Sequence, residues 1–306
     1  RKCYLLSVLL MTVWLTGCVQ EEFESTPSPA GNGIRFTLTV PDVNLPSVSS
    51  RTMTGTGTAK KEDEIETVDI LVFDMSKTPA VFLEWVSATG VTQDLADNST
   101  VSFSAVLSPT TASTCIVVVA NKELDNIVSG FTKGATTKVE AMEKMLHTQT
   151  GKWLADGSTT GGYTRIPMYG EKVISKITPS MDPITGINMK RMLARIDIRN
   201  NSATSNFTVE EVYLANYNTT GYIAPAWNTN GQVTDPVPDT PVLPAGSGKM
   251  TEEGDAILYS VNGNTPYDGE IYTFESLAAE DAGGAGADGE ASRKDATCLI
   301  VKGRIG

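Results

Sequence analysis

The chain alternates apolar and polar residues over much of its length, which is the pattern of strands with one buried face. Residues 34–40 show it clearly, because one face carries only apolar side chains: Ile34, Phe36, Leu38 and Val40. Residues 65–74 form a strong strand pattern with an apolar centre, and the continuous apolar run at 115–120 favours a central strand. Further strands are expected at residues 81–86, 99–107, 172–177, 189–198, 207–217 and 297–305.

One stretch follows a helical period. Apolar residues recur every three or four positions over residues 137–149, and Thr136 or Thr137 supplies a cap. Many short strands, one short helix and frequent turn signals predict a mainly β fold built from antiparallel β-sandwiches. With 306 residues, we expect two tandem sandwich domains, at residues 33–186 and 187–306. A strand pattern is still running at the end of the sequence, so we expect the second domain to be incomplete.

The first residues carry an export signal. Arg1 and Lys2 precede an apolar run of about 12 residues, which is shorter than the roughly 20 needed to span a bilayer. The run ends in the lipobox Leu15-Thr16-Gly17-Cys18. Residues 1–18 are therefore interpreted as a lipoprotein signal, with Cys18 as the lipidated residue that tethers the chain to a membrane surface. A plain secretory signal with a chance cysteine is the alternative.

Residues 19–32 are polar and contain proline, so we expect a tether that holds the folded part off the membrane. Glu21, Glu22 and Glu24 follow the lipid site directly. This acidic cluster resembles the surface-export signal of lipoproteins in the Bacteroides group; a solvated linker is the alternative.

The charge balance narrows the possible partners. Lys and Arg together number 24 against 36 Asp and Glu, which gives a net charge of −12. An acidic surface repels phosphate backbones, so we expect no nucleic-acid partner. Cys3 leaves with the signal, and the strand patterns around Cys115 and Cys298 predict two core thiols, with a disulfide outside the cytoplasm as the alternative.

Catalytic and metal-binding patterns do not emerge. His147 is the only histidine, and neither a nucleophile nor enough further ligands accompany it, so we interpret it as a partly exposed helix residue. We predict no metal, no cofactor and no enzymatic activity. The acidic pairs Glu62-Asp63-Glu64 and Glu210-Glu211 are interpreted as surface charge, although a hydrolase that uses carboxylates is the alternative.

Several segments together resemble the fimbrillins of the Bacteroides group, the FimA/Mfa-like family of type V pilus subunits. The resemblance covers nearly the whole chain and rests on the order and spacing of its segments. These are Leu15–Cys18, Ile34–Val40, Arg51 within Ser49-Ser50-Arg51-Thr52, Val68–Phe73, Ile166–Gly170 and Arg191–Ile198.

The resemblance implies transthyretin-like sandwiches and a mechanism of assembly. The subunit would reach the outer membrane as a lipoprotein with its first strand in place, and an Arg-specific protease would cut after Arg51. The strand with Ile34, Phe36, Leu38 and Val40 would then leave, and a C-terminal strand of the next subunit would fill the groove. The product would be a surface fimbrium, a homo- or heteropolymer that supports adhesion. Lys60 and Lys61 are alternative cleavage positions for a Lys-directed protease.

Two alternatives remain open. Residues 34–40 could be a permanent strand, with Arg51 an ordinary loop residue. The chain could also be a monomeric surface lipoprotein that binds glycans through stacking aromatic residues, with candidates Trp85, Trp153, Tyr222 and Trp227. Whether a fimbrial subunit of this sequence is shaft, tip or anchor is left open.

Overall fold

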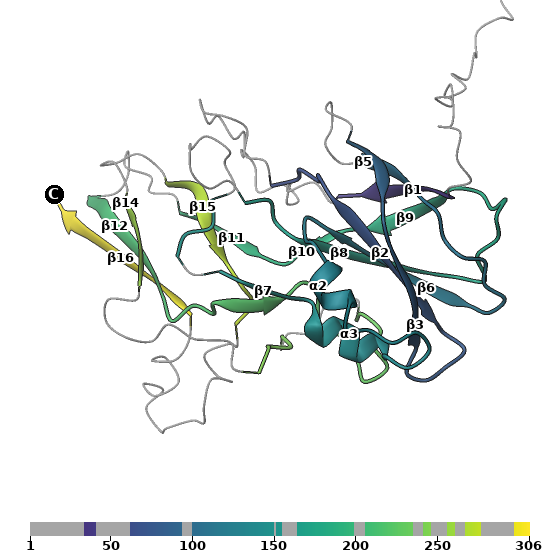
Figure 1. The fold of residues 1–306 in the computed structure, drawn as a ribbon. Helices are drawn as coiled ribbons and strands as arrows, with labels where there is room; N and C mark the ends of the chain where they lie inside the picture. The colour runs from purple at the N-terminus through teal and green to yellow at the C-terminus, as the bar shows by residue number, and fades with distance from the viewer. Residues whose placement is uncertain are drawn as a thin grey trace, which may run out of the picture. The chain divides into compact units, whose positions relative to one another are not determined.

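Strands dominate the computed structural model of the chain, and the two helices among the residues that it describes are short (Figure 1). Antiparallel pairing prevails in several sheets, so the predicted mainly β fold is confirmed. All described residues belong to one unit, residues 33–306. The structure describes residues 34–40, 62–93, 100–149, 151–154, 164–198, 206–234, 241–245, 256–260, 267–276 and 297–306.

Two sheets enclose the first core as a sandwich. The four-stranded sheet has the order β4-β5-β1-β9, and the five-stranded sheet has the order β10-β8-β6-β2-β3. Alternate residues of both sheets, such as Phe36 and Ile70, fill the space between them. The strands are β1 (Ile34–Thr39), β2 (Val68–Asp74), β3 (Val81–Ser87), β4 (Thr89–Gln93), β5 (Thr100–Ala105), β6 (Thr114–Ala120), β8 (Met168–Ile174), β9 (Ile184–Asn188) and β10 (Lys190–Arg191).

The five-stranded sheet is buried on both faces at its centre. In β2, Ile70 contributes to the first core, whereas Leu71 and Phe73 contribute to a second core on the opposite face. Strand β6 is buried along its whole length and lies in the middle of the sheet, which confirms the central strand predicted at residues 115–120. Burial on both faces is the reason that these strands are continuously apolar in sequence.

Helix α3 (Lys138–Lys144) covers the second core together with the single-turn helix α2 (Asp125–Val128). Thr137 caps α3 through a reciprocal pair of hydrogen bonds with Glu140, so one of the two predicted caps is confirmed. The buried Lys138 Nζ donates to Glu171 Oε2 in β8 at 2.6 Å, which fixes the start of the helix on the sheet. Neither described helix has the length and apolar character needed to cross a membrane.

The predicted helix is too long at its C-terminal end. It stops at Lys144, and the next residues form β7 (Leu146–Thr148), which pairs with β13 (Thr220–Tyr222). Met142 and Met145 are both buried in the second core, so the apolar spacing is real although only Met142 lies in the helix. A strand partner from far along the chain takes over the backbone hydrogen bonds beyond that point.

A third core lies between the sheets of the C-terminal region. Strand β12 (Phe207–Ala215) pairs with β14 (Ile257–Ser260) and β16 (Cys298–Ile305), while β11 (Ala194–Ile198) pairs with β15 (Tyr267–Thr273). Their inward side chains form this core: Val209, Val212, Leu214, Tyr217, Tyr259 and Ile271. Strands β4, β9, β13, β14 and β15 were not predicted. The first four have at most five residues each, and β15 lies beside low-complexity sequence.

Strand β9 crosses the expected domain boundary between residues 186 and 187. It runs parallel to β1, whereas every other strand pair is antiparallel among the described residues. The strand predicted at residues 189–198 is divided into β10, which joins the five-stranded sheet, and β11, which joins the third core. The division into two domains at this point stays a prediction.

Candidate functional site

Strand β1 lies inside the four-stranded sheet, with a neighbour on each side. It pairs with β5 in antiparallel register from Ile34 opposite Ala105 to Thr39 opposite Thr100. On its other side it runs parallel to β9, and beyond that strand Met189 N donates to the Thr39 carbonyl at 2.9 Å. If β1 were absent, β5 and β9 would each present an unpaired edge to the same slot.

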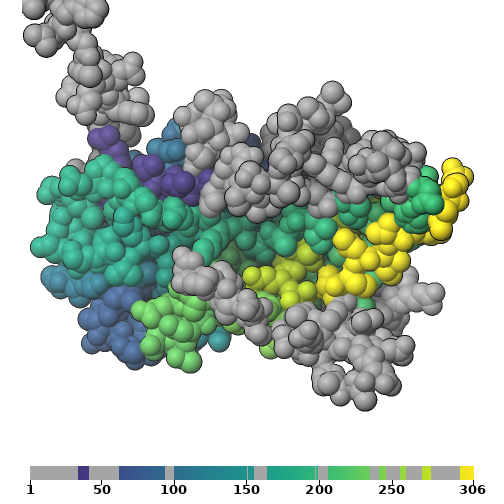
Figure 2. Space-filling view, turned by 180° about the vertical axis from the view of Figure 1, so that it is seen from behind, coloured from purple at the N-terminus to yellow at the C-terminus, as the bar shows by residue number. Residues whose placement is uncertain are grey.

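The side chains of β1 alternate between the first core and the surface. The inward residues Ile34, Phe36, Leu38 and Val40 are at most 5% exposed. Arg35 and Thr39 are exposed on the outward face, and β1 is visible as the purple segment at the surface in Figure 2. The four candidate groove residues therefore share one buried face, as their spacing predicts. Whether the strand leaves stays a prediction.

Phe36 makes the most specific contact in the slot. Its ring stacks on Phe103 of β5, with centroids 5.0 Å apart and an interplanar angle of 7°. Burial of four apolar side chains at ~1.5–3 kcal/mol each gives an upper estimate of roughly 6–12 kcal/mol for the strand, before ordering costs. A strand that occupies this slot must therefore carry apolar side chains at alternate positions.

Cys18 and Arg51, the predicted lipidation and processing residues, lie outside the described residues. In sequence, Arg51 falls between Val40 at the end of β1 and Glu62, where the described chain resumes. The lipid anchor and the cleavage position stay predictions.

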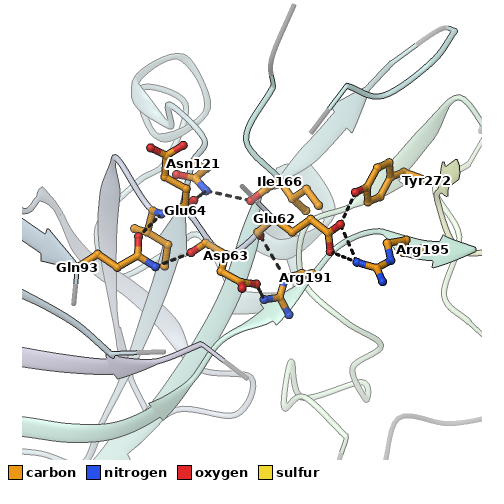
Figure 3. A network of polar contacts seen from close by, with 10 residues as sticks. Glu62, Asp63, Glu64, Gln93, Asn121, Ile166, Arg191, Arg195 and Tyr272 are labelled. Carbon is orange, nitrogen blue, oxygen red and sulfur yellow. Dashed lines mark hydrogen bonds and ion pairs between the residues drawn. The ribbon is translucent and has the colours of Figure 1, made fainter. Parts of the chain in front are cut away.

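A polar network begins at Glu62 (Figure 3). Glu62 is only 3% exposed, and its carboxylate accepts from Arg195 Nη1 at 2.8 and 2.9 Å. The hydroxyl of Tyr272 in β15 donates to the same carboxylate. The interpretation of this acidic run as surface charge is therefore wrong for Glu62. An opposite charge from β11 and a hydroxyl from β15 compensate its burial, which an unpaired carboxylate would not tolerate.

The aromatic candidates for glycan stacking are mostly built into the second core. Trp153 is buried, and Trp85 and Trp227 pack against the same cluster. The structure does bring Tyr222 and Trp227 together, edge to face with centroids 4.8 Å apart. Both are half-buried, and none of the tryptophans and tyrosines whose side-chain burial is described is exposed. The described residues thus offer no open aromatic face of the kind that sugar stacking uses.

His147 lies in β7 and not in the helix, so its interpretation as a helix residue is wrong. Its ring centroid is 5.0 Å from that of Trp153 and 6.5 Å from that of Phe274. Burial, reinforced by the positive charge of Lys122, lowers the pKa of His147 to about 4 from its ordinary value of 6.5. The imidazole is consequently neutral in the folded chain at neutral pH.

This lowered pKa predicts acid sensitivity. Below about pH 6.5, His147 is protonated in the unfolded chain but stays neutral in the folded chain. The free energy of unfolding that this group contributes above pH 6.5 is therefore lost as the pH falls towards 4. A shift of this size in a fully buried group corresponds to about 3 kcal/mol, which half-exposure to solvent reduces to about 1–2 kcal/mol. Denaturant unfolding at several pH values should show this loss in the native sequence and a smaller one in His147→Phe. Equal slopes in the two proteins would contradict the assignment.

Both described cysteines are free. Cys115 is buried in β6, where burial raises the pKa of its thiol to about 11, and Cys298 is half-buried at the start of β16. The two cysteines are therefore separate thiols and form no disulfide with each other. Cys115 is a core residue as predicted, whereas Cys298 is only half-buried.

The chemistry available at the β1 slot is apolar burial and backbone pairing. Within the described ranges, no three His, Cys, Asp or Glu residues gather closely enough to hold a metal ion. The flanking edges of β5 and β9 supply hydrogen-bonding groups to whichever strand lies between them. This arrangement suits recognition of an extended chain segment.

One family of known proteins matches a large part of the chain. The family model of the major fimbrial subunit protein (FimA) matches residues 34–237, which is more than half of the chain and includes the whole β1 slot. No curated protein matches the chain.

Three solved structures are similar to the chain. A fimbrial assembly protein from Parabacteroides distasonis ATCC 8503 shares 11% identity over 90% of this chain and 82% of its own, with a TM-score of 0.40. A proposed cell adhesion protein from the same organism shares 16% identity over 82% and 73%, with a TM-score of 0.45. A proposed adhesin from Bacteroides ovatus shares 13% over 80% and 68%, with a TM-score of 0.34. On the match of the family model, this chain belongs to the family of the major fimbrial subunit protein (FimA).

Proposed function

We propose that this chain is a structural subunit of cell-surface fimbriae that polymerises by exchange of β1 and supports adhesion. It is exported as a lipoprotein anchored at Cys18 on the outer membrane, and an Arg-specific protease cuts it after Arg51. Its partners are further fimbrial subunits, either copies of itself or related chains. Its role is structural, and no catalytic step is part of the proposal.

The observation that carries the proposal is the position of β1. One short strand supplies four buried apolar side chains to the first core and lies between two paired neighbours. Its departure would expose an apolar slot and two strand edges, a state that is unfavourable in water until another strand enters. A strand from the next subunit satisfies both the core and the edges, which is β-augmentation.

Exchange of this kind produces an open filament. Each subunit offers its slot to one neighbour and a strand to another, so the contact is head-to-tail and does not close. Burial of the strand's apolar side chains in the slot contributes roughly 6–12 kcal/mol of favourable free energy per junction, before ordering costs. We therefore expect slow dissociation. Fimbriae held in this way should resist dilution.

The N-termini of two cellular pools test the proposal. Mass spectrometry of the membrane-bound precursor should find an acylated chain that starts at Cys18, whereas purified fimbriae should contain a chain that starts at Thr52. Assembled material that still begins at the acylated Cys18 and retains residues 34–40 would refute the exchange of β1.

A further inference from the structure

The exchange of β1 raises the question of what holds the slot open while it is empty. In the four-stranded order β4-β5-β1-β9, only β1 joins the β4–β5 pair to β9 by a strand ladder. Loss of β1 therefore removes the backbone hydrogen bonds along one whole side of β5. An incoming strand needs β5 at its original place to pair in register.

Gln93, the last residue of β4, forms two hydrogen bonds outside that sheet. Its Nε2 donates to the carbonyl of Asp63 at 2.7 Å, and its Oε1 accepts from the amide of Ile65 at 3.1 Å (Figure 3). The side-chain amide of Gln93 thus binds two backbone groups of one segment, the carbonyl of Asp63 and the N–H of Ile65. Gln93 is also paired with Val101 of β5, so what holds Gln93 also holds the β5 wall of the slot.

Residues 62–66, here called the anchor segment, are themselves fixed by partners other than β1. Asn121, in a left-handed conformation with φ of 58°, donates to the Glu64 carbonyl at 2.8 Å and accepts from the Glu66 amide at 3.0 Å. Arg165 pairs with Glu64 and Glu66 at 3.2 and 2.6 Å. Asn121 directly follows β6 and Arg165 precedes β8, so both residues flank strands of the five-stranded sheet.

The start of the anchor segment is bound to strands later in the chain. Arg195 of β11 and Tyr272 of β15 hold the Glu62 carboxylate, and Arg191 of β10 pairs with Asp63. Arg191 Nε also donates to the Glu62 carbonyl at 3.3 Å. None of these partners belongs to β1, so the departure of β1 removes none of these contacts directly.

We propose that Gln93 and the anchor segment form a clip that holds the β5 wall of the slot in position while no strand occupies it. The proposal rests on the proposed function, since it concerns the state between the departure of one strand and the arrival of the next. Gln93 is a positioning residue: it acts on the incoming strand through β4 and β5. A slot fixed in advance avoids the ordering cost that a collapsed wall would add to strand entry.

The clip makes a specific prediction about strand uptake. The purified chain is cut within residues 41–61 by limited trypsin treatment, and a fluorescent peptide with the sequence of residues 33–40 is added in excess. Uptake of the peptide in place of β1 is followed by fluorescence anisotropy. Gln93→Ala should slow uptake by about tenfold, as expected from the loss of two hydrogen bonds.

Two variants separate this role from general stability. Gln149→Ala removes a glutamine that is also half-buried and bonds to a backbone carbonyl, of Lys152, away from the slot. The uncut Gln93→Ala and Gln149→Ala proteins should melt at similar temperatures, because β1 still ties β5 to β9, and only Gln93→Ala should slow uptake. Gln93→Glu keeps the acceptor for Ile65 and should recover part of the rate. Uptake in Gln93→Ala equal to that in Gln149→Ala would overturn the proposal.

Hydrogen exchange of the β5 amides distinguishes failure of the clip from failure of strand exchange. In the cut protein, once the β1 segment has been removed so that the slot is empty, exchange at residues 101–105 should be on the order of tenfold faster in Gln93→Ala than in the native sequence. If the cut native protein takes up no peptide, the exchange of β1 is wrong. Equal amide protection in the two cut proteins then rejects the clip as well, whereas selective loss of protection in Gln93→Ala supports it.

Discussion

Arg51→Ala is expected to leave the chain as a lipidated monomer that retains β1 and forms no fimbriae. The covalent link between Val40 and Glu62 holds β1 at its slot at a very high effective concentration, so an incoming strand cannot compete. Cleavage turns β1 into a separate segment that is lost once it dissociates. Electron microscopy of cells and size-exclusion chromatography of the extracted protein should show the loss of polymer.

The matched control is the double variant Lys60→Ala and Lys61→Ala, which removes the other basic residues in the same stretch before Glu62. It should assemble normally if the cut follows Arg51. Blocked assembly in the lysine variant with normal assembly in Arg51→Ala would instead assign processing to a Lys-directed protease. Fimbriae formed by an uncut chain would disprove the role of cleavage altogether.

Phe36→Ala and Phe103→Ala should destabilise the precursor to a similar extent, but only Phe103→Ala should destabilise the polymer. The two rings stack on each other in the first core, and truncation of either is expected to lower the free energy of unfolding of the precursor by about 3–5 kcal/mol. If β1 is exchanged as proposed, Phe36 is absent from the polymer, whereas Phe103 still lines the slot. Only Phe103→Ala should therefore weaken assembled fimbriae.

Two measurements check this contrast. Denaturant unfolding reports on the precursor, and the temperature at which fimbriae dissociate in detergent reports on the polymer. Arg35→Ala, on the exposed face of the same strand, serves as the control. It should change the free energy of unfolding by less than about 0.5 kcal/mol and leave the dissociation temperature of the fimbriae unchanged. If Phe36→Ala weakens the polymer as much as Phe103→Ala does, β1 is still in its slot after assembly and strand exchange is excluded.

The features predicted well from the sequence are local ones. The alternation in β1 reports which side chains face a core, because successive residues of a strand point to opposite faces. The continuous apolar runs in β2 and β6 report burial on both faces for the same reason. Thr137 and Glu140 specify the start of α3 within a few residues of chain. Each signal lies inside the element that it describes.

The polar network was missed because its partners are distant in sequence. Glu62 accepts from Arg195, which is 133 positions away, and from Tyr272, which is 210 positions away. From the local sequence alone, Glu62 cannot be distinguished from the other charged residues that surround it. The available signal was the pair Arg191 and Arg195 among the apolar residues of a predicted strand, since such arginines need acidic partners once buried.

The sequence alone determined that the chain is a mainly β protein, that its first strand has one apolar face, and that its segments follow a fimbrillin-like order. Only the tertiary structure decided that this strand lies between β5 and a parallel β9, and that the helix ends before β7. It also decided that Gln93 binds the anchor segment and that Glu62 joins this segment to β11 and β15. The physical reason is the range of the interactions. Burial periodicity is set by neighbours along the chain, whereas strand partners and ion pairs are chosen among residues that only folding brings together.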